Sequence, residues 1–236
     1  IVLKFGSSVL RTEADLPSAV HEIYRWSREG FDVAAVVSAF EGVTDRLLKQ
    51  ARDLGADPEQ GVGVSGIASL VASGERESAA ALQIALASAG VPASVLDPLS
   101  AGLRVEGDGL AGEPTDLDVA RCRAVLAKGR VLIVPGFFGV DDEGGVSLLG
   151  RGGSDWTALF LAQRLGGRCR LLKDTDGIFE HDPNHAGPAP RRFESLTFDD
   201  ALALHAPVVQ EAALRFAQAD RLRFEVAKTG SNGGTS

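Results

Sequence analysis

The stretch LLGRGGSDWTALFLAQRLGG, residues 148–167, decides the fold class, because it joins a glycine-rich turn to a strongly helical pattern. Ser154 or Asp155 is placed to cap the start of this helix, and Gly166 is placed to end it. The next segment, RCRLLKD at 168–174, predicts a strand. A turn, a helix and a strand in this order are typical of a parallel sheet covered by helices.

The same alternation of short apolar runs and amphipathic stretches continues along the chain and predicts an α/β protein. The segment 100–116 is rich in glycine and charge, and it predicts a hairpin or a lid. The tail after residue 228 has the composition of a loop or linker. Strands are expected in the opening IVLKF and over 32–40, 92–97 and 223–228, and 131–140 is expected to be a strand that runs into a turn. Helices are expected over 13–28, 43–54, 64–73, 76–89, 117–129, 195–204 and 207–220.

Composition limits the classes of function. A chain of 236 residues, 44% hydrophobic and 24% charged, is expected to form one compact unit. A formal charge of −8 without a dense basic run excludes nucleic acid as a partner. The longest apolar stretch, 131–140, is broken by Pro135 and Gly136, so we expect no membrane span. Cys122 and Cys169 lack the spacing of a zinc site or a disulfide framework, which fits a reducing compartment. No secretory signal opens the chain, so we expect a cytoplasmic location.

Two glycine turns are candidate binding sites, since helix N-termini present unsatisfied N–H donors to anions. One is KFGSSV, where Lys4 lies at the carboxyl end of the first strand, the edge at which open α/β sheets bind ligands. The other is GRGGSDW at 150–156, where Arg151 suits an anionic substrate and Asp155 suits the orientation of a lysine or a metal ion. On local grounds, a plain helix cap and an ordinary strand-end lysine explain these residues equally well.

Seven segments, taken in order, resemble the aspartate kinase branch of the amino acid kinase family. They are VLKFGSSV near the start, VVSAFEGVTDRLL at 36–48, SGERESAAALQIAL at 73–86, VPGFFG at 134–139, LLGRGGSDWTA at 148–158, KDTDGIFEHDP at 173–183 and KTG at 228–230. The resemblance implies a three-layer αβα sandwich around a mostly parallel sheet, as one domain over 1–236. It also implies an amino-acid lobe over about 1–140 and an ATP lobe over about 141–230, with no ACT domain in this chain.

The resemblance implies transfer of the ATP γ-phosphate to the side-chain carboxylate of L-aspartate. The products are 4-phospho-L-aspartate and ADP, the cofactors are ATP and Mg²⁺, and the reaction opens lysine, threonine and methionine biosynthesis. The residues suit this chemistry, because phosphoryl transfer needs positioned anions and neutralised charge rather than a nucleophilic side chain.

Roles follow position by position from the same resemblance. Lys4 stabilises the transferring phosphoryl group, and Asp155 organises that lysine and the reacting groups. Locally, Glu75 could instead be a solvated helix start, and Asp174 and Asp182 could be turn formers. The histidines indicate no protein metal site. Substrate contacts are assigned to Ser38, Thr44, Glu75 and Arg151, and nucleotide contacts to Gly6, Ser7, Ser8, Gly152, Gly153, Ser154, Lys173, Asp174, Phe179 and Asp182.

Two segments depart from the aspartate kinase pattern. The first loop reads KFGSSV where aspartate kinases usually read Lys-Phe-Gly-Gly-Thr-Ser, and GSSVL is closer to the opening of glutamate 5-kinases. The segment LHAPVVQEA at 204–212 lacks the lysine with which the family contacts ATP phosphates. Our hypothesis is that Lys173, which replaces the usual threonine before Asp174, compensates for it.

These departures keep two alternatives open: a kinase for another small acid such as glutamate, and a pseudokinase that serves as a nucleotide-binding module. By analogy with the family we expect a homodimer. Aspartate kinases commonly bear C-terminal ACT domains. The chain is therefore expected to be either an unregulated kinase module or part of a longer polypeptide, fused to a further domain after residue 236.

Overall fold

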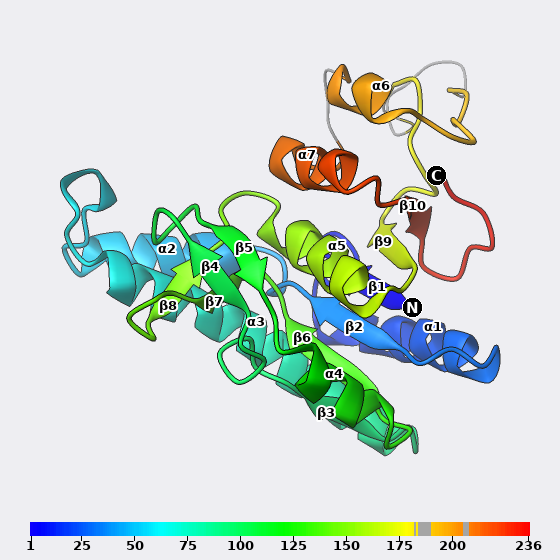
Figure 1. The fold of residues 1–236 in the computed structure, drawn as a ribbon, viewed down its shortest axis with the longest axis horizontal. Coiled ribbons are helices and arrows are strands. Elements are labelled where there is room, and N and C mark those ends of the chain that lie inside the picture. Colours follow the sequence, from blue (N-terminus) through cyan, green and yellow to red (C-terminus); the bar gives the residue numbers. More distant parts are fainter. Residues whose placement is uncertain (182, 184–189, 205–207) are drawn as a thin grey trace.

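The centre of the molecule is a six-stranded, fully parallel sheet of order β10-β9-β1-β2-β6-β3 (Figure 1). The computed structural model describes residues 1–181, 183, 190–204 and 208–236. The inner strands β1, β2 and β6 are buried along their whole length, which is why β2 and β6 read as continuous apolar runs and β1 is interrupted only by Lys4. The six strands are β1 (Val2–Phe5), β2 (Ala34–Val37), β3 (Ala93–Val95), β6 (Val131–Pro135), β9 (Cys169–Lys173) and β10 (Phe224–Lys228).

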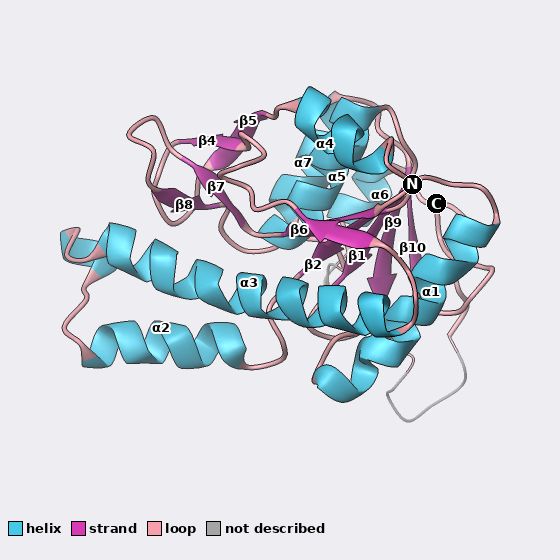
Figure 2. Cartoon of the chain, turned by 90° about the horizontal axis from the view of Figure 1, so that it is seen from below, coloured by secondary structure: helices cyan, strands magenta, loops and turns pink. Residues whose placement is uncertain are grey.

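Helices cover both faces of this sheet (Figure 2). Leu3 and Phe5 of β1 pack with α1 (Leu16–Arg28) and α3 (Val64–Ser88). Val2 of the same strand packs on the opposite face, because side chains alternate along a strand. That face is covered by α4 (Val119–Leu126), α5 (Gly153–Leu165) and α7 (Glu211–Ala219). The predicted αβα sandwich is confirmed. Within the described residues, the remaining helices are α2 (Val43–Asp53), α6 (Phe198–Leu202) and two 3₁₀ turns, Glu13–Asp15 and Pro58–Gln60.

A second, four-stranded sheet of order β5-β4-β7-β8 stands beside the first. The predicted hairpin within 100–116 supplies its antiparallel pair β4 and β5. Phe138 and Leu148 of this sheet pack against α2 and the first half of α3, through residues such as Leu47 and Ile67. Its strands are β4 (Arg104–Glu106), β5 (Glu113–Asp116), β7 (Phe138–Val140) and β8 (Val146–Leu148).

Two predicted elements differ from the structure. The helices expected over 64–73 and 76–89 are one continuous helix of 25 residues, α3. Gly74 sits inside it because α2 packs closely there, and a Cβ at Gly74 would lie 2.9 Å from Val43 Cγ1. The segment 131–140, expected as one strand that runs into a turn, contains two strands in different sheets, β6 and β7. The chain passes from one to the other at Phe137, whose φ of 74° breaks the extended conformation.

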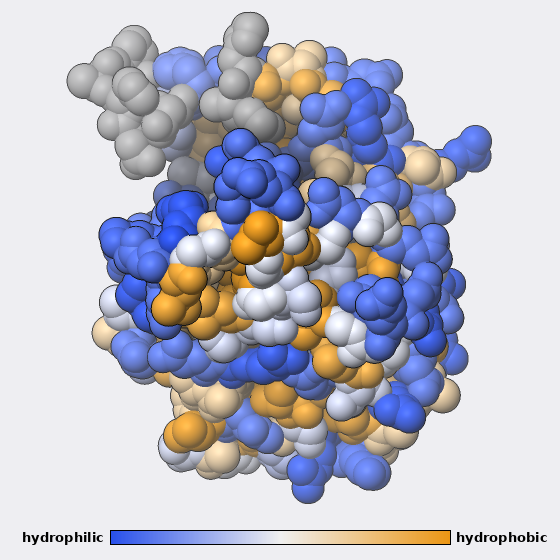
Figure 3. All heavy atoms as spheres, turned by 90° about the vertical axis from the view of Figure 1, so that its left-hand side faces the viewer, coloured by the Kyte–Doolittle hydropathy of each residue, from blue (hydrophilic) through white to orange (hydrophobic). Residues whose placement is uncertain are grey.

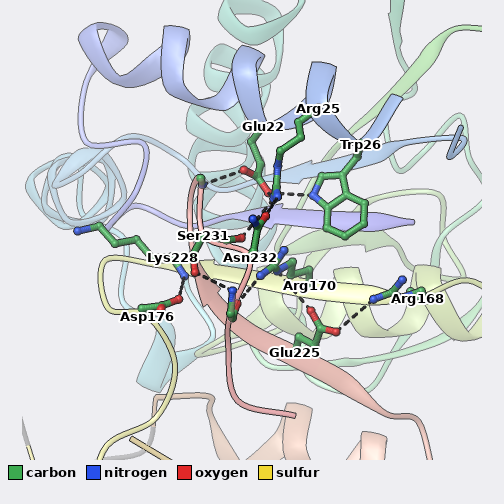
Figure 4. A network of polar contacts seen from close by, with 12 residues as sticks. Glu22, Arg25, Trp26, Arg168, Arg170, Asp176, Glu225, Lys228, Ser231 and Asn232 are labelled. Carbon is green, nitrogen blue, oxygen red and sulfur yellow. Dashed lines mark hydrogen bonds and ion pairs between the residues drawn. The ribbon is translucent and has the colours of Figure 1, made fainter. Parts of the chain in front are cut away.

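The C-terminal segment after β10 is anchored rather than a free linker, which corrects the expectation drawn from its composition (Figure 4). Glu22 of α1 is fully buried and accepts hydrogen bonds from Trp26 Nε1 at 2.8 Å and from the Gly230 amide at 2.8 Å. Arg25 donates to Asn232 Oδ1 at 2.5 Å. Arg170 of β9 donates to the Gly233 carbonyl. The segment is therefore tied to both α1 and β9.

On the face that carries α2 and the start of α3, apolar side chains gather in the middle and hydrophilic side chains surround them (Figure 3). Leu54 and Val62, in the connection between these helices, are 78% and 50% exposed. Across the described ranges no helix combines the length and apolar character needed to cross a membrane.

Candidate active site

Two lysines meet one aspartate at the carboxyl-terminal edge of the central sheet. Lys4 lies on β1 and Lys173 ends β9, which pairs with β1 in parallel. Lys4 Nζ lies 2.7 Å from Asp155 Oδ1, and Lys173 Nζ lies 2.8 Å from Asp155 Oδ2. Because Asp155 belongs to the first turn of α5, that helix begins at the same edge.

All three charged groups are withdrawn from water, with side-chain exposures of 8% for Lys4, 13% for Lys173 and 4% for Asp155. Burial alone would raise the pKa of Asp155, but Lys4 and Lys173 outweigh it and hold this pKa below its ordinary value. Burial, together with the charge of Lys4, lowers the pKa of Lys173. An ionised carboxylate therefore holds both lysines in place.

The start of α5 differs from the predicted cap. Neither Ser154 nor Asp155 caps the helix; the N-cap is Gly152, in the left-handed conformation with φ 75° and no side-chain cap bond. Gly153 follows where a Cβ would lie 2.6 Å from the ring of Phe137. Asp155 does not cap the helix because it already lies inside the first turn and its carboxylate pairs with Lys4 and Lys173. The predicted end at Gly166 is confirmed, and Leu159, Phe160 and Leu161 on this helix are buried.

A cleft of about 530 Å³, here called the Arg151 cleft, opens beside this trio. It brings together most residues predicted to contact substrate and phosphate, although they come from β1, α2, α3 and the start of α5. Arg151 is exposed, whereas Glu75 is buried. The predicted residues that line it are Lys4, Ser7, Ser38, Thr44, Glu75, Arg151, Gly152, Gly153, Ser154, Asp155 and Lys173.

Glu75, which lines the Arg151 cleft, is a buried carboxyl group. It is 2% exposed, and its Oε2 has no hydrogen-bond partner. Burial raises its pKa to about 8, against the opposing effects of the Ala39 backbone and Lys4. One helical turn later, Ser78 Oγ donates to the Ser38 carbonyl at 2.7 Å, which fixes the loop after β2 against α3. A buried carboxyl with an unpaired oxygen suits a cationic ligand group.

A second cleft of about 720 Å³, the Phe179 cleft, adjoins the first at Lys173. The predicted nucleotide residues Ser8, Lys173, Asp174 and Phe179 line it. Gly6 lines neither cleft; it lies instead against Lys4, where a Cβ would be 2.6 Å from Nζ. The predicted nucleotide residue Asp182, like His185 and His205, falls outside the described part of the chain.

The chain is similar in sequence to known proteins. A sequence profile of the amino acid kinase family matches residues 1–228. The chain belongs to the amino acid kinase family. An aspartokinase of Pseudomonas aeruginosa is 33% identical over 92% of this chain and 52% of that protein. Aspartokinase 2 of Bacillus subtilis is 31% identical over 100% of this chain and 58% of that protein. The chain spans about half the length of the curated relatives it matches.

Solved structures agree with this assignment. An aspartate kinase from Synechocystis matches with a TM-score of 0.81 and 27% identity, over 99% of this chain and 38% of that chain. Aspartokinase III of E. coli, in complex with aspartate and ADP, matches with a TM-score of 0.83 and 21% identity, over 100% of this chain and 63% of that chain. An isopentenyl phosphate kinase shares the fold at a TM-score of 0.70 and 16% identity, over 99% of this chain and 98% of that chain. The predicted amino acid kinase fold is confirmed.

Several residues of this amino acid kinase site escaped prediction. Phe137 lines the Arg151 cleft with a strained backbone, held by its amide donating to Thr157 Oγ1 at 3.1 Å. Asp45 and Gln210 also line this cleft. The motif VPGFFG indicated the region around Phe137 but did not identify a particular side chain. Nothing in the local sequence indicates a role for Gln210.

The carboxylates beside the two clefts decide whether the site can take the expected magnesium. Among the residues that the structure describes, no three His, Cys, Asp or Glu side chains gather as a protein-only metal site. Magnesium does not need one, since it is usually held by one or two carboxylates together with substrate phosphates. Both oxygens of Asp155 are engaged by lysines, whereas Asp174 lines the Phe179 cleft beside Lys173. The residues therefore fit a magnesium ion that arrives with the nucleotide.

Proposed function

We propose that this chain is an ATP-dependent aspartate kinase, which transfers the γ-phosphoryl group of ATP to the side-chain carboxylate of L-aspartate. The products are 4-phospho-L-aspartate and ADP, and the reaction is the first step of lysine, threonine and methionine biosynthesis. The observation that carries the proposal is the junction of two clefts at one buried Lys4–Asp155–Lys173 trio. Relatives named aspartokinase support aspartate as the acceptor.

The Arg151 cleft offers complementary groups for an amino acid. Arg151 at the rim presents a planar guanidinium that can bind the α-carboxylate through two hydrogen bonds. Glu75 inside the cleft offers an unpaired oxygen to the ammonium group. Ser38 and Thr44 supply hydroxyls between them. Bound in this way, the acceptor side chain is free to reach toward Lys4.

The Phe179 cleft supplies the donor side. Phe179 suits contact with the adenine ring, Ser8 and Asp174 line the same cleft, and Lys173 lies at the junction with the Arg151 cleft. Magnesium bound with ATP neutralises phosphate charge. In the transfer itself, an acceptor carboxylate oxygen bonds to the γ-phosphorus while the bond from that phosphorus to the bridging oxygen breaks. Lys4 and the N–H groups at the start of α5 face the charge that develops on the equatorial oxygens.

One experiment tests the proposal. ADP release is measured with Mg-ATP and aspartate, glutamate or no acceptor, while hydroxylamine traps any acyl phosphate as a hydroxamate. Aspartate-dependent hydroxamate is the expected result. Hydroxamate with glutamate alone would replace the acceptor, and nucleotide binding without turnover would leave a pseudokinase module instead of a kinase.

A further inference from the structure

Lys173 occupies a position that its neighbours make unusual. It lines the Arg151 cleft, the Phe179 cleft and a third hollow beside α1, so that it stands where all three meet. Asp155 needs only one cation for charge balance, and Lys4 already supplies it at 2.7 Å. A second lysine on the same carboxylate, at 2.8 Å, is therefore more than the ion pair requires.

The charge at this junction is left unbalanced. With Lys4, Lys173 and Asp155 ionised, the sum is +1 + 1 − 1 = +1, in side chains that are at most 13% exposed. Glu75, which also lines the Arg151 cleft, is buried and favours its neutral form near pH 7, whereas Asp174, which follows Lys173 in the chain, is exposed to water. A buried net positive charge is costly unless an anion accompanies it. The arrangement thus fits a site that an anionic group occupies during function.

The chain offers few other lysines for this task. It contains five, at positions 4, 49, 128, 173 and 228, and none between 174 and 227. Val208 and Gln210, on the segment that enters the Arg151 cleft before α7, bring no charge. Lys228 is the register partner of Lys173 on β10, but it is exposed and lines only the third hollow. Lys173 is the lysine whose ammonium group is fixed beside that of Lys4.

We propose that Lys173 is a catalytic residue of the transfer step, which binds the moving phosphoryl group together with Lys4 rather than only anchoring the nucleotide. This inference rests on the proposed function. As the acceptor oxygen bonds to the γ-phosphorus and the electron pair of the breaking bond stays on ADP, both ammonium groups face the phosphoryl oxygens. Asp155 holds the two lysines apart and oriented, and neither lysine has to gain or lose a proton.

The test compares Lys173→Met, which keeps an unbranched apolar stem, with Lys228→Met as the matched control on the neighbouring strand. Lys173→Met is expected to lower kcat by roughly 100-fold or more, as removal of a transition-state donor does, while the dissociation constant for Mg-ADP changes less than about threefold. Lys228→Met is expected to keep both values. Thermal unfolding checks the fold of each variant, and we expect it to be intact because Asp155 keeps its ion pair with Lys4.

A second measurement does not depend on turnover. Aluminium fluoride with Mg-ADP and aspartate places a phosphoryl mimic beside the nucleotide, and it should tighten ADP binding in the wild type but not in Lys173→Met. Unchanged kcat in Lys173→Met, equal tightening in both proteins, or a parallel loss of kcat and ADP affinity would each overturn the inference. Failure of the proposed function looks different, because the wild type itself would then form no aspartyl hydroxamate.

Discussion

Gly6 lies directly against the ammonium group of Lys4, so that a Cβ at Gly6 would be 2.6 Å from Nζ. The far end of a lysine can move aside at little cost, and the Gly6→Ala protein should therefore fold normally. The same movement shifts Nζ relative to Asp155 without removing either charge of the pair, and a shift of about 1 Å in a reacting group can cost roughly 100-fold in rate. We expect kcat to fall by that order in steady-state assays. Gly167→Ala, where nothing lies within 4 Å of the added Cβ, is the control; equal losses in both variants would contradict the argument.

Asp155→Asn should destabilise the protein strongly, because two buried lysines would then face each other without their carboxylate. Breaking a buried ion pair costs about 3–5 kcal/mol, which urea denaturation can measure. The control is Asp53→Asn, whose ion pair with Lys49 is exposed and should contribute less than about 1 kcal/mol. Because the pKa of Asp155 is lowered in the folded state, its contribution is present above its unfolded value of 3.8 and is lost as the pH falls through the folded pKa. The difference between wild type and Asp155→Asn should therefore shrink at acid pH.

Acceptor binding should release a proton through Glu75. Burial raises the pKa of Glu75 to about 8, so the carboxyl is largely protonated at neutral pH, and an ammonium group favours the ionised form. The affinity for aspartate should rise with pH and level off near pH 8. Titration calorimetry in two buffers of different ionisation enthalpy counts the proton. Glu75→Gln should abolish the release, whereas Glu77→Gln, on the exposed side of the same helix, should retain it. Identical proton release in Glu75→Gln would rule out this role.

Gly74→Ala should affect both stability and acceptor binding. Its Cβ would lie 2.9 Å from Val43 Cγ1 and 3.2 Å from Ala39 Cβ, and overpacking of this kind costs about 1–3 kcal/mol. The strain falls on the segment that presents Ser38 and Thr44 to the Arg151 cleft, so KM for aspartate should increase more than KM for ATP. Gly66→Ala in the same helix meets no atom within 4 Å and should stabilise the protein by about 0.5–1 kcal/mol. A normal KM in Gly74→Ala would show that α2 adjusts without moving the loop.

The sequence predicted the parts of the site that depend on order along the chain. Strand, glycine turn and helix follow one another locally, so Lys4 and Asp155 could be placed at one edge of a parallel sheet. The partner of Lys173 was not predictable in this way. Its contact with Asp155 depends on the register between β1 and β9, which hydrophobic patterning leaves open. Phe137 escaped for a related reason, since its positive φ is imposed by Thr157 and the crossing between two sheets.

The composition of the segment after residue 228 predicted a linker, and this prediction was wrong. Glycine, serine and asparagine are typical of linkers, yet the Gly230 amide bonds to Glu22, 208 residues earlier in the chain. Such a pairing has no local signature. The long helix α3 was divided in the prediction for a comparable reason, because Gly74 favours a break until the packing of α2 against it is known.

The contacts of the residues after Lys228 limit how far the protein can be truncated from its C-terminus. The family profile stops at Lys228, and a chain ended there would lack the Gly230 amide, Asn232 and the Gly233 carbonyl. Glu22 and Arg170, which are 0% and 3% exposed, would each lose a partner. Residues 1–228 should accordingly unfold at clearly lower denaturant concentration than 1–236. The residues after Lys228 are thus expected to stabilise the fold, although they lie outside the profile match.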